Sequence, residues 1–570
     1  MDKLWEKHYT GEVPASLTYP AAPIDHFLRE SARTHPDRAA LIFEGAKISY
    51  RSLDAQVDGC AAGLHKLGVG KGDRVALLLP NCPHAVISFY AIFRLGAIAV
   101  PINPLYQERE IAQQIDDAGA RVLITLDMFS ARAHAVMGRS PANICVVGTI
   151  SDYLPPLKKM LYPLLRPKGT GAESQAPICE TVTFRDLTLH QAPPEMDIDP
   201  ADIAILQYTG GTTGISKGAE LTHGNIVSNT LQMAAWYYII RRGQEVFLTV
   251  LPLFHTYGIA VCMNLSLATA SSMVLIPRFA PREVLKAIKE YGVTFFPGIP
   301  GIYAALNNYR DIATWDISSV RYCVSGSAPL PVPVLQDFER RTGGIILEGY
   351  GLTEASPVTH SNPVHRERKA GSIGLPLADT DCKIVDLTDG TREVPVGEAG
   401  ELCIKGPQVM KGYWRRPDET RQALKDGWLC TGDIARMDAD GYFYIMERKK
   451  DMIISEGFNV YPSEIDEVVL THPDIAEAAA VGVSDRLRGE KVVLFVVLRD
   501  GKRLSRDELL LYCRERLAKY KMPKGIIFKS ELPKTAVGKV LRRALRDEAM
   551  LMTAPRFEGC GRPPRGTDHD

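Results

Sequence analysis

Hydrophobic and polar positions follow two different periods along the first half of the chain. A continuous apolar run at 75–79 has the length of a buried strand, and mainly apolar segments of similar length return at 121–126, 201–208 and 320–325. Segments between them, such as 53–64 and 85–95, carry apolar residues at helical spacing. Buried strands that alternate with helices predict parallel strands with crossover connections, and therefore an α/β domain.

The pattern of elements starts again beyond residues 447–451, five consecutive charged positions that we expect to form a solvated stretch between domains. A helix is predicted near Pro462, and a second helix follows the capping box formed by Ser505 and Glu508. Three strands are predicted around these helices, at 476–483, 492–498 and 526–529. This part of the chain predicts a small α+β domain of about 100 residues, which is enough for its own core.

We therefore expect a large N-terminal α/β domain with mixed sheets over residues 1–449 and a small α+β lid domain over 450–552. A polar tail rich in Gly and Pro, residues 553–570, is predicted to be disordered. The length of 570 residues agrees with more than one domain, because a single core rarely grows beyond about 300 residues.

Composition favours a cytoplasmic globular protein and excludes a nucleic-acid-binding footprint. Hydrophobic residues make up 45% of the chain and charged residues 24%, with 67 basic and 67 acidic side chains. Eleven cysteines are scattered without a CxxC pair, which indicates reduced thiols and argues against zinc or a disulfide framework. The N-terminus lacks the apolar core of a secretory signal. An uncharged stretch, 257–277, is predicted to be a buried helix followed by a strand rather than a membrane span.

One segment leaves two interpretations open. Residues 152–169 read DYLPPLKKMLYPLLRPKG, in which apolar side chains alternate with four basic ones. The segment could lie on an anionic membrane face, on the inner side of the membrane, or it could be a surface loop whose apolar residues pack on the domain below. The following residues, up to 198, are predicted to be a connecting loop.

The stretch 208–218, YTGGTTGISKG, follows a predicted strand and offers backbone amides, hydroxyls and the cation Lys217. This combination suits a polyphosphate, because amides and hydroxyls donate to its oxygens and lysine supplies a positive charge. The stretch is not a Walker P-loop, in which Lys and then Ser or Thr follow the last Gly directly. A flexible loop without a ligand is the alternative.

Further along the chain, several residues have the chemistry of a site for a nucleotide. His255 lies in LPLFHTYG between two apolar runs, after a predicted apolar helix at 226–240. The stretch 320–330 ends in small residues that let a flat ring lie against backbone, and EGYGLTE offers an aromatic ring, a hydroxyl and a carboxylate that suit Mg²⁺. Asp433, predicted to lie in a turn, can accept from ribose hydroxyls.

These segments, with ERKKDMI, GFNVYPSEI and PKTAVGKVLRR, together resemble the motif series of the adenylate-forming enzymes, which include acyl-CoA synthetases, luciferases and peptide-synthetase adenylation domains. The likeness covers roughly residues 25–548 and is greatest to bacterial long-chain fatty-acyl-CoA synthetases. It implies the fold of that superfamily, a large domain of several α/β subdomains with a small C-terminal lid. It also implies ATP, Mg²⁺ and coenzyme A as cofactor and co-substrates.

The resemblance assigns roles position by position. The β- and γ-phosphates would contact the stretch 208–218, namely Tyr208, Thr209, Gly210, Gly211, Thr212, Thr213, Gly214, Lys217 and Gly218. Thr212 and Glu354 would hold Mg²⁺, and Thr353 would contact the α-phosphate. The adenine ring would be framed by Ser327, Ala328, Gly349 and Tyr350. Asp433 and Arg448 would bind ribose, Lys450 would be the hinge, Gly457 would line the pantetheine passage, and Lys539 would be the adenylation lysine. The acyl tunnel would involve Trp236, His255, Ser325 and Gly326.

The implied activity is ATP-dependent conversion of a fatty acid to acyl-AMP and then to acyl-CoA, with catalysis by Lys539, Glu354, Thr353 and His255. A medium-chain, aromatic or alicyclic acid remains an alternative substrate, and a luciferase-type oxygenase shares the first step. From another class, a non-catalytic membrane-associated protein for fatty-acid uptake is the alternative. The chain length of the acid, the position of the lid and the oligomeric state, including a homodimer, stay open.

Overall fold

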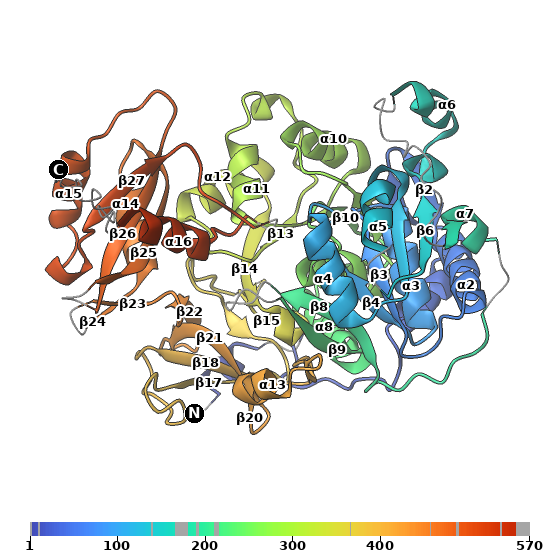
Figure 1. Ribbon diagram of the computed structural model, residues 1–570, viewed down its shortest axis with the longest axis horizontal. Helices are drawn as coiled ribbons and strands as arrows, with labels where there is room; N and C mark the ends of the chain where they lie inside the picture. Colours follow the sequence, from blue (N-terminus) through green and yellow to red (C-terminus); the bar gives the residue numbers. More distant parts are fainter. Residues whose placement is uncertain are drawn as a thin grey trace, which may run out of the picture. The chain divides into compact units, whose positions relative to one another are not determined.

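The computed structural model (Figure 1) describes residues 3–9, 12–137, 141–165, 180–189, 193–209, 216–364, 366–455, 458–485, 489–535 and 538–553. The chain divides into two units. The N-terminal unit comprises residues 1–431 and 435–445, and the C-terminal unit comprises residues 432–434 and 446–570. The domain limits at 449 and 552 stay a prediction, and residues 554–570 of the expected tail lie outside the described part of the chain.

An eight-stranded sheet in the N-terminal unit has the order β19-β9-β8-β4-β3-β5-β6-β7. Its strands are β3 (Arg74–Leu78), β4 (Ile98–Pro101), β5 (Val122–Leu126), β6 (Ile144–Gly148), β7 (Glu180–Thr183), β8 (Ile203–Thr209), β9 (Lys217–Thr222) and β19 (Gly412–Tyr413). The strands from β8 to β7 run parallel, and only β9 and β19 are antiparallel to their neighbours. Because parallel strands end at one edge, the loops after β8, β4, β5 and β6 share that edge.

Helices cover both faces of this sheet, as the alternation along β3 requires. Val75 and Leu77 belong to the main core, which includes α2 (Tyr50–Lys66) and α3 (Pro83–Arg94). Ala76 and Leu78 point to the other face and pack in a separate core with α4 (Glu108–Ala118) and α5 (Ser130–Met137). Successive side chains of a strand alternate between faces, so a strand buried on both faces has to be apolar throughout.

A nine-stranded sheet has the order β16-β15-β14-β13-β12-β10-β11-β1-β2. Its strands are β1 (Ala39–Phe43), β2 (Ala46–Ser49), β10 (Val246–Thr249), β11 (Ser272–Leu275), β12 (Phe295–Gly298), β13 (Tyr322–Ser325), β14 (Ile345–Gly351), β15 (Val358–Ser361) and β16 (Leu375–Pro376). The central strands β14, β13, β12, β10, β11 and β1 are parallel. The accompanying helices are α1 (His26–Thr34), α8 (His223–Trp236), α9 (Leu265–Ala268), α10 (Pro281–Tyr291), α11 (Pro300–Asn307) and α12 (Val332–Thr342).

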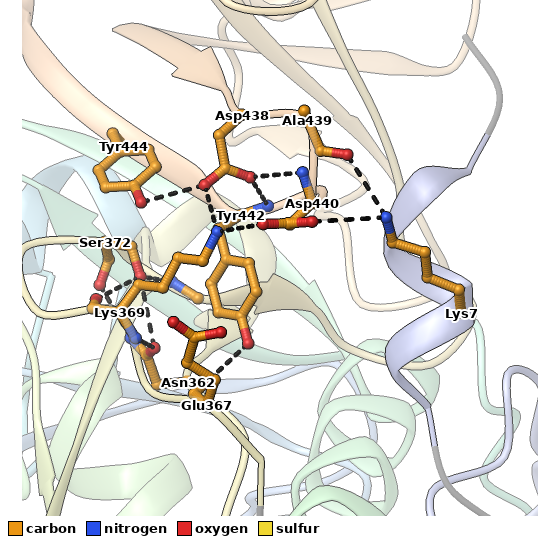
Figure 2. A network of polar contacts seen from close by, with 11 residues as sticks. Lys7, Asn362, Glu367, Lys369, Ser372, Asp438, Ala439, Asp440, Tyr442 and Tyr444 are labelled. Atoms are coloured by element: carbon orange, nitrogen blue, oxygen red, sulfur yellow. Dashed lines mark hydrogen bonds and ion pairs between the residues drawn. The ribbon is translucent and has the colours of Figure 1, made fainter.

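A third sheet contains β17 (Asp381–Val385), β18 (Gly400–Lys405), β20 (Leu424–Lys425), β21 (Trp428–Met437) and β22 (Phe443–Arg448), with α13 (Pro417–Ala423) beside β20. Figure 2 shows how the turn between β21 and β22 is held. The Lys369 ammonium lies 2.8 Å from Asp438 Oδ2 and 2.7 Å from Asp440 Oδ2, and both carboxylates raise its pKa. Lys7, in η1 (Leu4–His8), reaches the same turn through Asp440. This network fixes the start of the chain on the third sheet.

The C-terminal unit is built on a sheet of order β24-β23-β26-β25, with β27 paired to β26. Its elements are β23 (Ile453–Ser455), β24 (Phe458–Val460), α14 (Pro462–Leu470), β25 (Ile475–Asp485), β26 (Gly489–Leu498), α15 (Arg506–Arg514), η7 (Lys519–Lys521), β27 (Gly525–Lys529) and α16 (Arg542–Thr553). Leu494 faces a core shared with α14 and α15, whereas Phe495 faces a core shared with α16. The predicted α+β domain is confirmed, including the Ser505–Glu508 capping box.

The parallel strands and crossover helices predicted from the sequence are confirmed. The uncharged stretch 257–277 also forms what was predicted, a buried helical segment, η4 (Gly258–Asn264, a π-helix) with α9, followed by β11. No helix in the described ranges combines the length and the apolar character needed to cross a membrane.

Four local predictions are wrong. The connecting loop predicted up to 198 contains β7 and α7 (Phe184–Leu187), because the alternating sequence ETVT pairs with the sheet edge. The helix predicted at 226–240 is α8, which ends at Trp236. Asp433 lies within β21 rather than in a turn, after Gly432 with φ of 70°. Glu447 is buried, because its carboxylate accepts from the amide of Ser463.

Candidate active site

The candidate phosphate stretch begins at the end of β8 and ends at the start of β9, two antiparallel strands that pair with each other. Thr209 pairs with Lys217 and Tyr208 pairs with Gly218, so the stretch leaves and re-enters the sheet at adjacent positions. The Ser216 hydroxyl donates to the Thr209 carbonyl at 2.8 Å and closes the base of this stretch. Gly210, Gly211, Thr212, Thr213 and Gly214 lie outside the described residues.

Tyr208 is held in place at the start of this stretch. Its hydroxyl donates to Asp117 Oδ2 at 2.7 Å, and burial together with this carboxylate raises its pKa. A Cβ on Gly218 would lie 3.2 Å from the Tyr208 ring. Glycine is therefore needed at 218, because the ring lies across the backbone of the opposite strand.

The residues assigned to adenine come from the ends of two adjacent parallel strands, β13 and β14. Ser325 pairs with Glu348, which brings the loop containing Ser327 and Ala328 beside Gly349 and Tyr350. Ser327 adopts a left-handed backbone conformation, with φ of 72°. Such a conformation is costly for a residue other than Gly and is common at ligand sites.

Glu348 was not among the predicted site residues, although it fixes this loop. Its Oε1 accepts from the Leu330 amide at 3.0 Å, and its second oxygen is buried without a hydrogen-bond partner in the described part of the chain. Burial raises the pKa of Glu348 to about 7, an effect that hydrogen bonds from backbone amides oppose. The signal that could have found it is a carboxylate inside an otherwise apolar strand.

Thr353 and Glu354 follow β14 in a short helical turn, η6 (Thr353–Ala355). Glu354 Oε1 accepts from the Tyr413 hydroxyl at 2.7 Å, and the Glu354 carbonyl accepts from the Met410 amide at 2.8 Å. The Thr353 hydroxyl lies 3.2 Å from that of Thr256. The EGYGLTE and LPLFHTYG motifs, about 100 residues apart in the sequence, are thus in direct contact.

Lys217 and Glu354 both contact the same residue, Tyr413. The Lys217 ammonium is 5.5 Å from the centroid of the Tyr413 ring and 3.9 Å from Glu419 Oε1. The Tyr413 hydroxyl also donates to Glu354. One tyrosine therefore contacts both the lysine assigned to phosphate, through its ring, and the glutamate assigned to the metal, through its hydroxyl. Tyr413 and Glu419 were not predicted as site residues. Tyr413 lies in GPQVMKGYW, residues 406–414, a motif that supports the family resemblance but to which the sequence assigned no role in the site.

His255, Ser325 and Gly326, three of the residues assigned to the acyl tunnel, lie near the same strand ends. Burial lowers the pKa of His255 to about 4, so the imidazole is neutral at physiological pH. Ser325 is fully buried, and a Cβ on Gly326 would lie 3.3 Å from the Tyr257 ring. Trp236 packs edge-to-face on Tyr9 and donates to the Asn362 carbonyl at 3.2 Å. The assignment of Trp236 to the acyl tunnel stays a prediction.

The C-terminal unit contains the other assigned residues. Arg448 Nε lies 2.7 Å from Asp433 Oδ1, so the two residues assigned to ribose form an ion pair. Lys450 is exposed, and Gly457 lies outside the described residues. Lys539 is exposed overall, yet the atoms crowded around its ammonium lower its pKa to about 8 by desolvation. Arg448 and Lys450 lower this pKa further, whereas Asp433 and Asp451 raise it.

The donors around Glu354 fit Mg²⁺. This ion prefers oxygen ligands, takes one or two carboxylates from the protein and fills its remaining positions with water and substrate phosphate. Tyr413 donates to one carboxylate oxygen of Glu354, and Thr353, the preceding residue, has its hydroxyl 3.2 Å from that of Thr256. Thr212, the other assigned ligand, lies outside the described residues.

Comparisons with known proteins agree with this geometry. The family model described as "AMP-binding enzyme" matches residues 28–414, and that of the "AMP-binding enzyme C-terminal domain" matches residues 464–539. The long-chain-fatty-acid–CoA ligase of Bacillus subtilis (strain 168) is 44% identical over 554 residues, which cover 96% of this chain and 98% of that protein. The enzyme of that name from Salmonella typhimurium (strain LT2) is 39% identical over 560 residues, covering 96% and 99%.

Among solved structures, the O-succinylbenzoate coenzyme A synthetase of Bacillus subtilis in complex with ATP and a magnesium ion is similar with a TM-score of 0.74. It is 31% identical to this chain, and the match covers 92% of this chain and all of that one. Sequence and structure agree across both units, and the chain therefore belongs to the AMP-binding enzymes, with the adenylate-forming fold.

Proposed function

We propose that the protein is an acid–thiol ligase that converts a long-chain fatty acid to acyl-AMP and then to acyl-CoA, releasing pyrophosphate and AMP. The single observation that carries the choice of substrate is the similarity over nearly the whole chain to two enzymes named long-chain-fatty-acid–CoA ligase. The chemistry is supported by Lys217, Glu354 and Thr353, which the fold gathers at adjacent strand ends.

In the first step, the fatty-acid carboxylate attacks the α-phosphorus of ATP and pyrophosphate leaves. Both reactants are anionic, so catalysis consists mainly of offsetting negative charge. Lys217 and the amides of 208–218 bind the β- and γ-phosphates, Thr353 contacts the α-phosphate, and Lys539 stabilises charge at the reacting phosphoryl group. His255 is neutral and borders the carboxylate without adding a charge. Mg²⁺, when bound by Glu354 and Thr212, supplies further charge neutralisation on the phosphates.

In the second step, the thiol of coenzyme A attacks the acyl-adenylate carbonyl and AMP leaves. Asp433 and Arg448 hold the ribose, and the part of the chain beyond Lys450 moves about that residue so that Gly457 replaces Lys539 at the reaction centre. One pocket can then serve two reactions that need different groups.

The test is fatty-acid-dependent exchange of labelled pyrophosphate into ATP, followed by CoA-dependent release of AMP over a panel of acids. Acids of 12 to 18 carbons should give the highest kcat/KM, ahead of hexanoate, ferulate and cyclohexanecarboxylate. Exchange with none of these acids would contradict the assignment as a ligase. A higher kcat/KM for ferulate or cyclohexanecarboxylate would retain the ligase and replace its substrate.

The pKa of Lys539 predicts the pH dependence of adenylation. A lysine with a pKa of about 8 is protonated below that pH and neutral above it, so kcat/KM for ATP should fall as pH rises through about 8. A lysine at its ordinary value of 10.5 would keep the activity beyond pH 9. In Lys539→Arg the fall should disappear, because arginine stays charged throughout this range. A fall at pH 8 that persists in this variant would assign it to another group.

We also propose that α6 (Pro156–Leu165) contacts an anionic membrane surface, from which the lipid substrate is taken. Leu157, Met160 and Leu161 lie on one face at helical spacing, and the first two are more than 60% exposed. Tyr153 and Leu154, which precede the helix, pack on the domain below, as one interpretation of the sequence expected, whereas Leu157 and Met160 are exposed. Lys158 is paired with Glu44 at 2.9 Å, which leaves Lys159 as the cation beside this apolar face.

Flotation with vesicles that contain 30% phosphatidylglycerol tests this contact. The double substitution Leu157→Glu and Met160→Glu should reduce the vesicle-bound fraction at least fivefold, because it places charge on the apolar face. Leu511→Glu, at a similarly exposed leucine of α15, is the matched control and should bind like the wild type. Equal binding of all three proteins would exclude α6 as the membrane contact.

A further inference from the structure

We propose that Tyr413 is a positioning residue that links the metal-binding carboxylate of Glu354 to the phosphate-binding cation of Lys217. The inference rests on the proposed function, because it gives a role to a residue beside two groups that ATP and Mg²⁺ would contact. Tyr413 itself contacts neither reacting atom in this proposal. It acts through the orientation of its two neighbours.

The backbone sets the first half of this link. Tyr413 pairs with Ala219 in the antiparallel ladder between β19 and β9, and the Trp414 amide donates to the Gly218 carbonyl at 2.8 Å. Lys217 is two residues from Ala219 and therefore lies on the same face of the sheet, diagonal to Tyr413. This register accounts for the Lys217 ammonium lying 5.5 Å from the ring centroid. A ring face at that distance attracts a cation and restricts where its flexible side chain goes.

The second half of the link is a pair of hydrogen bonds to Glu354 from the same short segment. The Met410 amide donates to the Glu354 carbonyl at 2.8 Å, and the Tyr413 hydroxyl donates to Glu354 Oε1 at 2.7 Å. The backbone and the side chain of Glu354 are thus both held by residues 410–413. A carboxylate with one oxygen engaged in this way presents the other in a fixed direction, which is what an ion with strict octahedral geometry requires.

The position of Tyr413 is itself well determined. Its amide donates to the Thr420 hydroxyl at 2.9 Å, and a Cβ on the preceding Gly412 would lie 2.9 Å from the Thr420 side chain. A glycine at 412 therefore lets α13 approach β19 closely. Tyr413 is held by hydrogen bonds of both its backbone amide and its side-chain hydroxyl. Its fixed position therefore restricts the orientation of the Glu354 carboxylate.

The variant Tyr413→Phe removes the hydroxyl and keeps the ring, so it tests the hydrogen bond to Glu354 alone. Metal affinity is measured because it does not depend on turnover. Mn²⁺ is titrated into enzyme with the non-reactive analogue α,β-methylene-ATP, and free Mn²⁺ is followed by electron paramagnetic resonance. We expect the dissociation constant for Mn²⁺ to rise roughly tenfold, as is typical when a partner of a metal ligand is removed. Tyr444→Phe, which removes a similar hydroxyl bond to Asp438 of 3.1 Å, is the matched control and should leave it unchanged.

A double-mutant cycle with Glu354→Ala, which removes the acceptor of the Tyr413 hydroxyl, separates positioning from a general loss of packing. If Tyr413 acts through Glu354, adding Tyr413→Phe to the Glu354→Ala protein should raise the dissociation constant by less than twofold. The same tenfold rise in both backgrounds, or a Tyr413→Phe protein that binds Mn²⁺ like the wild type, would overturn the inference. Both results leave the ligase assignment intact. That assignment fails separately if the wild type shows no fatty-acid-dependent pyrophosphate exchange.

Discussion

Lys539→Ala should lower the rate of acyl-adenylate formation by roughly 10²- to 10³-fold while leaving thioester formation from supplied acyl-adenylate within about threefold of the wild type. The physical reason is that adenylation brings a carboxylate against a polyphosphate and needs a cation at the reacting phosphorus. Attack of a thiol on the activated carbonyl does not need that cation. Pyrophosphate exchange measures the first half-reaction, and conversion of synthetic palmitoyl-AMP with CoA measures the second.

Lys534→Ala is the control, because Lys534 precedes the same loop and pairs with Glu477 at 2.7 Å. It removes an identical charge from the C-terminal unit without removing the amine assigned to adenylation. Both half-reactions should therefore keep nearly full rates. An equal loss of both half-reactions in Lys539→Ala would contradict the proposed division between the two steps.

Glu354→Gln should give the second large effect, a fall in kcat for pyrophosphate exchange of roughly 10²-fold or more at moderate Mg²⁺. The amide keeps the size of the side chain and can still accept from the Tyr413 hydroxyl, but it lacks the negative charge that the ion prefers. Raising Mg²⁺ should recover part of the loss, because the defect is in metal affinity. The rate is measured as a function of free Mg²⁺ at saturating ATP and palmitate.

Glu339→Gln is the matched control for this variant. Glu339 lies on α12 in the same unit, and its carboxylate forms an ion pair with Arg368. Within the described residues, no part of the site contacts it. Its variant should show the wild-type dependence on Mg²⁺. If Glu354→Gln also retained that dependence, Glu354 would not be the metal ligand.

The pattern of apolar runs was sufficient to predict the α/β class and the restart of elements beyond residue 451. A buried parallel strand such as β5 is apolar at every position but Thr125, and the Ser505 capping box marks a helix start by local chemistry alone. The wrong predictions are those in which tertiary contacts override local composition. β7 forms because a sheet edge pairs with it, and Glu447 is buried because Ser463 supplies a partner.

The sequence by itself determined which residues carry chemistry, since Lys217, Glu354, Asp433 and Lys539 stand in motifs whose residue types match nucleotide binding. Their side chains have reactive groups wherever they lie, and the order of motifs along the chain is enough to identify the family. The tertiary structure decided how these groups are held. Tyr413 meets Glu354 only because β19, some 190 residues beyond β9, pairs with it in one register. Glu348 acquires a raised pKa only by burial. Such neighbours are fixed by long-range pairing and desolvation, which leave no local pattern in the chain.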